Sequence, residues 1–87
     1  MPDPRQQGTL AASGQSGEIH GKRADIALSG TWVGTVNLQR YVSGGWNNTG
    51  DSWTANAIDV VDGATHGTYR LDWTRTSGSL VYDIRGG

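Results

Sequence analysis

The feature that most constrains this chain is the alternation of apolar and polar residues at every second position. Such alternation is typical of β-strands with one buried face, because successive side chains of a strand point to opposite sides of the sheet. It predicts clear strands at residues 24–30, 34–42, 68–75 and 79–86, with shorter ones at 52–55 and 58–61. No segment keeps the period of a helix. An all-β protein is therefore expected.

The apolar side of each predicted strand supplies the expected core. This set comprises Ile26, Leu28, Trp32, Val36, Leu38, Val42, Tyr69, Leu71, Trp73, Leu80, Tyr82 and Ile84. Turn-forming residues that tolerate positive φ separate the strands, among them Ser29-Gly30, Ser43-Gly44-Gly45, Asp62-Gly63, His66-Gly67 and Ser77-Gly78. About six to eight short strands at this spacing predict a small antiparallel β-sandwich or a barrel-like domain.

Residues 1–17 differ in composition from the rest of the chain. They are polar, Pro2 and Pro4 oppose helix formation, and Leu10 with two alanines offers the main apolar contact. We therefore expect an extended N-terminal arm at residues 1–17 that binds a neighbouring chain, followed by the β-sandwich domain at residues 18–87. Leu10 is a candidate partner-binding residue.

The charge balance and the lack of Cys exclude several kinds of partner and site. Seven Lys and Arg stand against eight Asp and Glu, a formal net charge of −1, without the basic excess of a nucleic-acid-binding surface. With no Cys, the chain has neither disulfides nor thiolate metal sites. It also lacks an export signal and an apolar run of the roughly 20 residues that cross a membrane. We expect a soluble protein that binds neither nucleic acid nor membrane.

No set of residues predicts an enzyme, a metal site or a cofactor site. Asp59 and Asp62 come closest to the paired carboxylates of a glycosidase, but they adjoin a glycine turn, where Asp commonly bonds the local backbone. His20 and His66 each adjoin a glycine, and neither has companions at metal-ligand spacing. No G-x-S-x-G turn supports a nucleophilic Ser. We expect no catalytic residue, no hydrolase activity and no cofactor.

The stretch SGGWNNTGDSW, residues 43–53, places two Trp among turn-forming residues. It predicts either an aromatic site for sugars or a hairpin whose tip carries one wedge-like Trp. The other three Trp of the chain are expected in or over the core, which leaves Trp46 as the surface Trp. Together with Asn47 and Asn48 it forms a candidate partner-binding site. A sugar site would need two or more coplanar exposed aromatic rings.

The last two predicted strands are expected to pair with each other as a hairpin. A two-residue turn would set Asp72 opposite Asp83, a repulsive pair, whereas a four-residue loop sets Arg70 opposite Asp83. Directly opposed charges are worth roughly 0.2 to 1 kcal/mol each. The sequence therefore predicts the register that pairs Arg70 with Asp83.

Three segments, SGTWVGTVNLQRYVSGGW, SWTANA and YRLDWTRTSGSLVYDIRG, carry a family resemblance. Their shared elements are a Gly-Thr-Trp entry, a Val-Asn-Leu-Gln-Arg strand, a Gly-Gly hairpin and a Tyr-Arg-Leu strand followed by Ser-Gly and a final strand. Over roughly residues 26–86 the chain resembles the short β-sandwich accessory virion proteins of tailed bacteriophages, of the decoration or cement kind.

The resemblance implies a non-enzymatic structural protein of the virion that stabilises the head shell and is assembled in the host bacterial cytoplasm. It implies the major capsid protein or other virion subunits as partners, and a homo-oligomer that is a trimer by family analogy. Two alternatives stay open. One is a tail or collar adaptor of the same particle, and the other is a carbohydrate-binding or receptor-binding module that takes a glycan.

Overall fold

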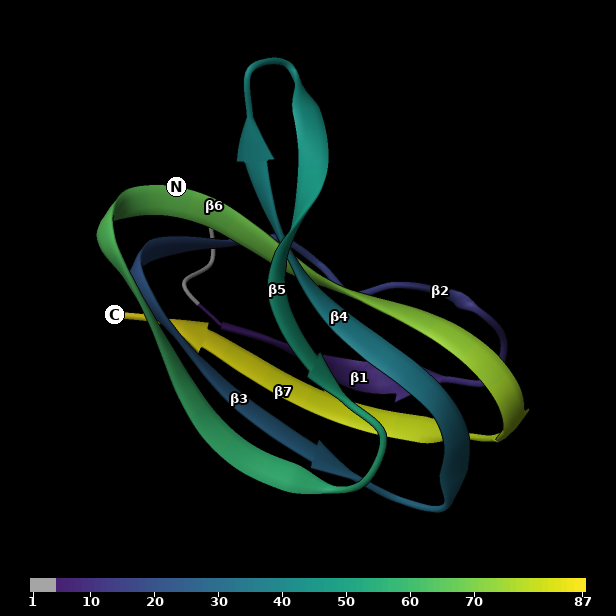
Figure 1. Ribbon diagram of the computed structural model, residues 1–87. Coiled ribbons are helices and arrows are strands. Elements are labelled where there is room, and N and C mark those ends of the chain that lie inside the picture. The colour runs from purple at the N-terminus through teal and green to yellow at the C-terminus, as the bar shows by residue number, and fades with distance from the viewer. Residues whose placement is uncertain (1–4) are drawn as a thin grey trace.

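The computed structural model in Figure 1 shows one antiparallel sheet whose strands curve around a common core. It describes residues 5–87, except for the side chains of residues 64–66. The strands are β1 (Arg5–Leu10), β2 (Gly14–Gln15), β3 (Ile19–Ser29), β4 (Trp32–Val42), β5 (Gly45–Trp53), β6 (Ala57–Gly78) and β7 (Leu80–Gly86). The predicted all-β fold class is confirmed. Within the described part of the chain, no helix is long and apolar enough to cross a membrane.

Strand β6 is the element that joins the two halves of the sheet. The strands follow the order β1-β7-β3-β6-β4-β5, and β2 pairs with β6 outside this path. The first part of β6 pairs with β3 and the second part with β4. Tyr69 stands where the two pairings meet, opposite Ile19 on β3 and Arg40 on β4. One continuous strand therefore carries the sheet around the core.

The alternation seen in the sequence explains which side chains fill this core. The fully or nearly fully buried apolar residues are Ile19, Ala24, Ile26, Leu28, Trp32, Val36, Leu38, Tyr69, Leu71, Trp73, Leu80 and Ile84. Most of them occupy the predicted inward positions. Burying a large apolar side chain stabilises a fold by about 1.5 to 3 kcal/mol, so a core of this size can order a chain that has no disulfide.

Two predicted core residues lie elsewhere. Val42 has the right parity on β4 but is 46% exposed, because β4 continues past the core into a hairpin. Tyr82 is only partly buried against the core. Its ring covers Gly8 of β1, at whose position a Cβ would come within 3.1 Å of the Tyr82 hydroxyl.

The segment from residue 52 to residue 78 contains fewer breaks than the sequence predicts. The expected strands at 58–61 and 68–75 are parts of the single strand β6, which runs through both the Asp62-Gly63 and His66-Gly67 pairs. These glycines do not end strands. They allow side chains from elsewhere in the sheet to approach the β6 backbone closely. A Cβ on Gly63 would collide with the Tyr69 hydroxyl, and one on Gly67 would meet the Arg40 guanidinium at 2.6 Å.

The predicted pairing of the last two strands is wrong. In the described residues β7 pairs with β3 and β1, and β6 pairs with β3, β4 and β2. Arg70 lies opposite Gln39, while Asp83 lies opposite Gln7 and Ala27. The reason is that both edges of each strand are taken by other partners: β4 and β2 flank β6 at Trp73 and Asp72, and β1 and β3 flank β7.

The described part of the expected N-terminal arm belongs to the sheet. Strand β1 pairs with β7 along its whole length, and β2 pairs with β6 at Trp73 and Asp72. Buried Ser16 extends this attachment: its backbone N–H donates to the Leu71 carbonyl at 2.9 Å, and its hydroxyl accepts from the Leu71 N–H at 2.8 Å. Backbone pairing within the chain thus orders a segment that has almost no apolar side chains, and a detached arm is not seen over residues 5–17.

Candidate interaction site at the β4–β5 hairpin

Strands β4 and β5 form a hairpin that projects beyond the body of the molecule (Figure 1). Val42 pairs with Gly45, so the turn has two residues, and both have positive φ: 56° at Ser43 and 80° at Gly44. This is the geometry of a type I′ turn, whose twist matches that of the flanking strands. The turn predicted at Ser43-Gly44-Gly45 is therefore confirmed at Ser43 and Gly44, while Gly45 already belongs to β5.

Asn47 braces the turn from the side. Its Nδ2 donates to the Val42 carbonyl at 3.3 Å and to the Gly45 carbonyl at 3.2 Å. These bonds link both strands at the tip to one side chain. The tip is held in one shape before any partner arrives, which lowers the entropy that binding would cost.

An aromatic cluster lies on one side of the hairpin. Trp46 pairs with Tyr41 across the strands, with ring centroids 5.4 Å apart and planes at 75°. Arg70, reaching from β6, places its guanidinium carbon 4.2 Å from the centroid of the Trp46 ring. Such a cation–π contact contributes about 0.5 to 1 kcal/mol at an exposed site. Trp46 is consequently half-buried, not a free wedge.

A chain of polar side chains continues on the same side. Arg70 Nε donates to Gln39 Oε1 at 2.8 Å, and Gln39 Nε2 donates to Asn48 Oδ1 at 3.0 Å. The arginine that covers Trp46 is thus held in place by β4, which is itself bonded to β5. Three strands cooperate in fixing the orientation of the Trp46 ring.

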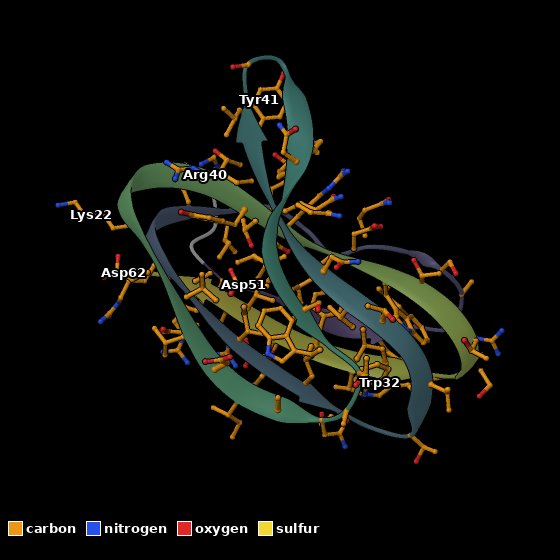
Figure 2. The ribbon with its side chains drawn as sticks, in the orientation of Figure 1. Lys22, Trp32, Arg40, Tyr41, Asp51 and Asp62 are labelled. Atoms are coloured by element: carbon orange, nitrogen blue, oxygen red, sulfur yellow. The ribbon has the colours of Figure 1, made fainter. Side chains whose placement is uncertain are left out.

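The base of the hairpin is attached to the body through Arg40, which Figure 2 places where the hairpin leaves the sheet. The Arg40 guanidinium lies 5.5 Å from the Tyr69 ring centroid, and Nη1 donates to the Gly63 carbonyl at 3.4 Å. Tyr41 lies far out along the hairpin (Figure 2) and is 49% exposed, with Val42 beside it. A rigid base therefore presents an aromatic and an aliphatic side chain to the surroundings.

The structure brings together three of the four residues predicted to bind a partner. Trp46 and Asn48 share one side of β5, and Asn47 points to the other side. Leu10 lies apart from them, at the end of β1 opposite Leu80, and packs against the core. Leu10 is thus partly engaged in holding β1 to the body.

Sequence reasoning missed Tyr41, Val42 and Arg70. A signal existed for the first two, because a two-residue turn at Ser43-Gly44 sets Tyr41 opposite Trp46 and carries both strand ends away from the core. Arg70 left no such signal. It lies more than twenty residues from Trp46 in the sequence, and only the β4–β6 register brings the two side chains into contact.

The aromatic rings do not form a flat platform for a sugar. Tyr41 and Trp46 meet edge to face. Trp32 and Trp73 form another edge-to-face pair inside the core, with centroids 6.2 Å apart. Trp53 packs against the core and donates from Nε1 to Asp59 Oδ2 at 3.2 Å. The coplanar exposed pair that a sugar site would need is not found among the described residues.

The polar residues considered for chemistry have local roles where their side chains are described. Asp59 accepts from the Trp53 indole and from the Val60 backbone N–H, at 2.8 Å in the second case. His20 Nδ1 lies 2.9 Å from the Thr68 hydroxyl oxygen. The side chain of His66 lies outside the described set. Among the residues searched, no group of three or more His, Asp or Glu could hold a metal ion.

The hairpin is also distinct in charge. From residue 26 to residue 50 the sequence contains no Asp or Glu, and Arg40 and Arg70 stand on the two sides of the hairpin base. The site therefore combines the exposed side chains of Tyr41 and Val42 beside the turn with two arginine side chains at its base. Its arrangement suits contact with another macromolecular surface, because rigid aromatic and Arg side chains are the residues that dominate binding energy at protein interfaces.

Comparison of the chain with protein-family models, with curated protein sequences and with solved structures finds no match.

Proposed function

We propose that this protein is a non-enzymatic accessory subunit of a tailed-bacteriophage virion, of the decoration or cement kind, and that its β4–β5 hairpin docks on the major capsid protein. Within this proposal the curved sheet serves as a small sandwich-like cap on the head shell, which is assembled in the bacterial cytoplasm. The resemblance of the three quoted segments supports the class of protein. The observation that carries the docking role is the preformed turn presenting Tyr41 and Val42.

We assign docking to the hairpin in preference to the N-terminal segment for a physical reason. The described residues of that segment already pair with β7 and β6, so laying them across another chain as a detached arm would break those hydrogen bonds. The hairpin tip loses no such bonds when it contacts a partner. In a homo-oligomer, the linked hairpins would bind one symmetric shell more firmly than a single hairpin does, through multivalency.

The proposal is tested by binding of the purified protein to capsids of its phage that lack it. Changing Tyr41 and Val42 together to Ala should weaken binding by about tenfold or more, since hot-spot truncations cost more than about 1 kcal/mol. Val33→Ala is the matched control, because Val33 is similarly exposed but lies at the far end of β4. Equal loss in both variants would contradict the hairpin assignment.

The same preparation separates the alternatives. Immunogold labelling of intact particles at the collar or tail in place of the head would make the protein an adaptor. Binding to a glycan array without binding to any virion subunit would favour the carbohydrate-binding or receptor-binding module.

A further inference from the structure

The outer face of strands β1, β7, β3 and β6 carries apolar side chains that the core does not use. Ile58 is 90% exposed, Val60 is 54% exposed, and Val81 is also exposed. Half-buried Ala27 lies next to Ile58 on the neighbouring strand. Ile58 and Val60 lie two positions apart on β6, so both side chains point to the same side of the sheet. Contiguous exposed apolar residues rimmed by polar ones mark interaction surfaces.

The strand registers arrange this face in two complete rows. The first row runs Arg5, Arg85, Asp25, Val60 and the second runs Gln7, Asp83, Ala27, Ile58, each read from β1 through β7 and β3 to β6. All eight positions point outward, because they alternate with the core residues of their strands. A shallow hollow of about 420 Å³ lies over the part of the face that includes Asp25, Ala27, Ile58, Val60, Asp83 and Arg85.

This arrangement complements itself under a two-fold rotation. Consider an axis that lies in the face, perpendicular to the strands, between the two rows. The rotation stacks each strand on its own copy and exchanges the rows. Arg85 then faces Asp83 of the second copy, and Val60 faces Ile58 of the second copy. The two remaining positions of each row set Arg5 on Gln7 and Asp25 on Ala27. Each of these contacts occurs twice in the pair.

Other arrangements fit less well. A two-fold axis along the strands would pair Arg85 with Asp25 of the second copy, but it would set Val60 on Arg5 and Ile58 on Gln7. It therefore places both exposed apolar side chains on polar ones. A partner with one strong sign of charge would meet like charge at two of the four charged positions, because the face carries Arg5 and Arg85 together with Asp25 and Asp83. The positive and negative charges of this face are balanced, and a second copy of the same face matches such a pattern best.

From this layout we infer that the β1-β7-β3-β6 face is an isologous interface with a second copy of this chain. The two β6 strands bring Ile58 and Val60 into a shared apolar centre, and Arg85–Asp83 pairs flank it. The inference does not rest on the proposed virion function, because it uses another surface and its test needs only the purified protein.

The test is sedimentation equilibrium of the full chain over about 1 μM to about 1 mM, a range in which interfaces of modest area associate. The wild-type protein should reach the mass of a dimer. Arg85→Asp and Asp83→Arg should each weaken the homodimer by about tenfold or more, because each sets like charges face to face. A one-to-one mixture of the two variants should recover dimers, since every facing pair is then of opposite sign.

A second variant keeps the test valid if Asp83→Arg fails to fold after losing its bonds to Arg5. Ile58→Asp changes a residue that is almost fully exposed, so the monomer should fold normally, as circular dichroism would verify, while the dimer is lost. Val33→Asp is the control and should leave the dimer intact. A monomer throughout the range, a trimer, or a dimer unaffected by Ile58→Asp would overturn the inference.

Discussion

At the residue scale, the most sharply defined electrostatic contact is the pair formed by Arg5 and Asp83. Arg5 Nε donates to one carboxylate oxygen at 3.0 Å and Nη2 donates to the other at 2.7 Å. This bidentate hydrogen bonding from Arg5 lowers the pKa of Asp83 below its usual 3.8. Burial opposes the shift, and the charges of Arg5 and Arg85 add smaller contributions that lower the pKa further. The contact ties β1 to β7 at the end of β1 that lacks apolar anchors.

A pH dependence follows from the direction of this pKa shift. Because the pKa of Asp83 is lower in the folded state, the pair stabilises the fold at pH values above 3.8, and this stabilisation is lost as the pH falls through the lowered value. Asp83→Asn should therefore be less stable than wild type at pH 7, by a modest amount because the pair is partly exposed to solvent. Urea unfolding at pH 7 and at pH 2 measures this. A difference that persists at pH 2 would show that the loss is not electrostatic.

At the element scale, the turn of the β4–β5 hairpin contains one residue in an unfavourable backbone conformation. Ser43 has φ of 56°, a region that disfavours residues other than Gly, Asn and Asp. The next residue is Gly44, at which an added Cβ would meet nothing within 4 Å. The turn is thus held by Asn47 and by strand pairing despite an unfavourable first residue.

Replacing Ser43 by Asn should stabilise the protein. The change produces Asn-Gly, the pair most favoured in type I′ turns, and improvements of this kind raise the free energy of unfolding by roughly 0.5 to 1 kcal/mol. Ser52→Asn, within the strand β5, is the control and should give no gain. Thermal unfolding of the two variants is the measurement. A gain of equal size at both positions would contradict the explanation by turn conformation.

At the scale of the whole molecule, the N-terminal segment completes the sheet. Strand β1 supplies six paired residues along β7, and Ser16 joins the segment to β6 at Leu71. The chain measures only 33 × 21 × 21 Å. A large share of its residues therefore lies near the surface of the molecule. Removing this segment would uncover β7 on one side and β6 on the other.

Deletion of residues 1–17 should therefore destabilise the body of the protein. Loss of a covering strand and of a buried hydrogen-bonding group should lower the free energy of unfolding by about 3 kcal/mol or more. Ser16→Ala alone should cost about 1 to 2 kcal/mol, because it leaves the buried Leu71 N–H without the hydroxyl that accepts from it. Urea denaturation compares the two with wild type. An unchanged midpoint after the deletion would instead support a detached arm.

Which residues face the core could be predicted from the sequence, because the two-residue period of a strand is a local property of its backbone. Ile26, Leu38, Leu71 and Ile84 lie where that period puts them. The hairpin turn and the surface position of Asn47 and Asn48 followed from equally local chemistry, since a Ser-Gly pair suffices to define them. The all-β class and these features were determined by the sequence alone.

The strand partners were decided only by the tertiary structure. Asp83 of β7 lies opposite Gln7 of β1 and Ala27 of β3, and not opposite a residue of β6, the strand that precedes β7 in the sequence. Arg70 lies over the Trp46 ring. The alternation of residues within one strand specifies which side of the strand is buried. It does not specify which strands pair, because more than one set of strand pairings can enclose the core. That choice depends on how all the apolar sides together exclude water, and this property belongs to the whole chain and to no single segment.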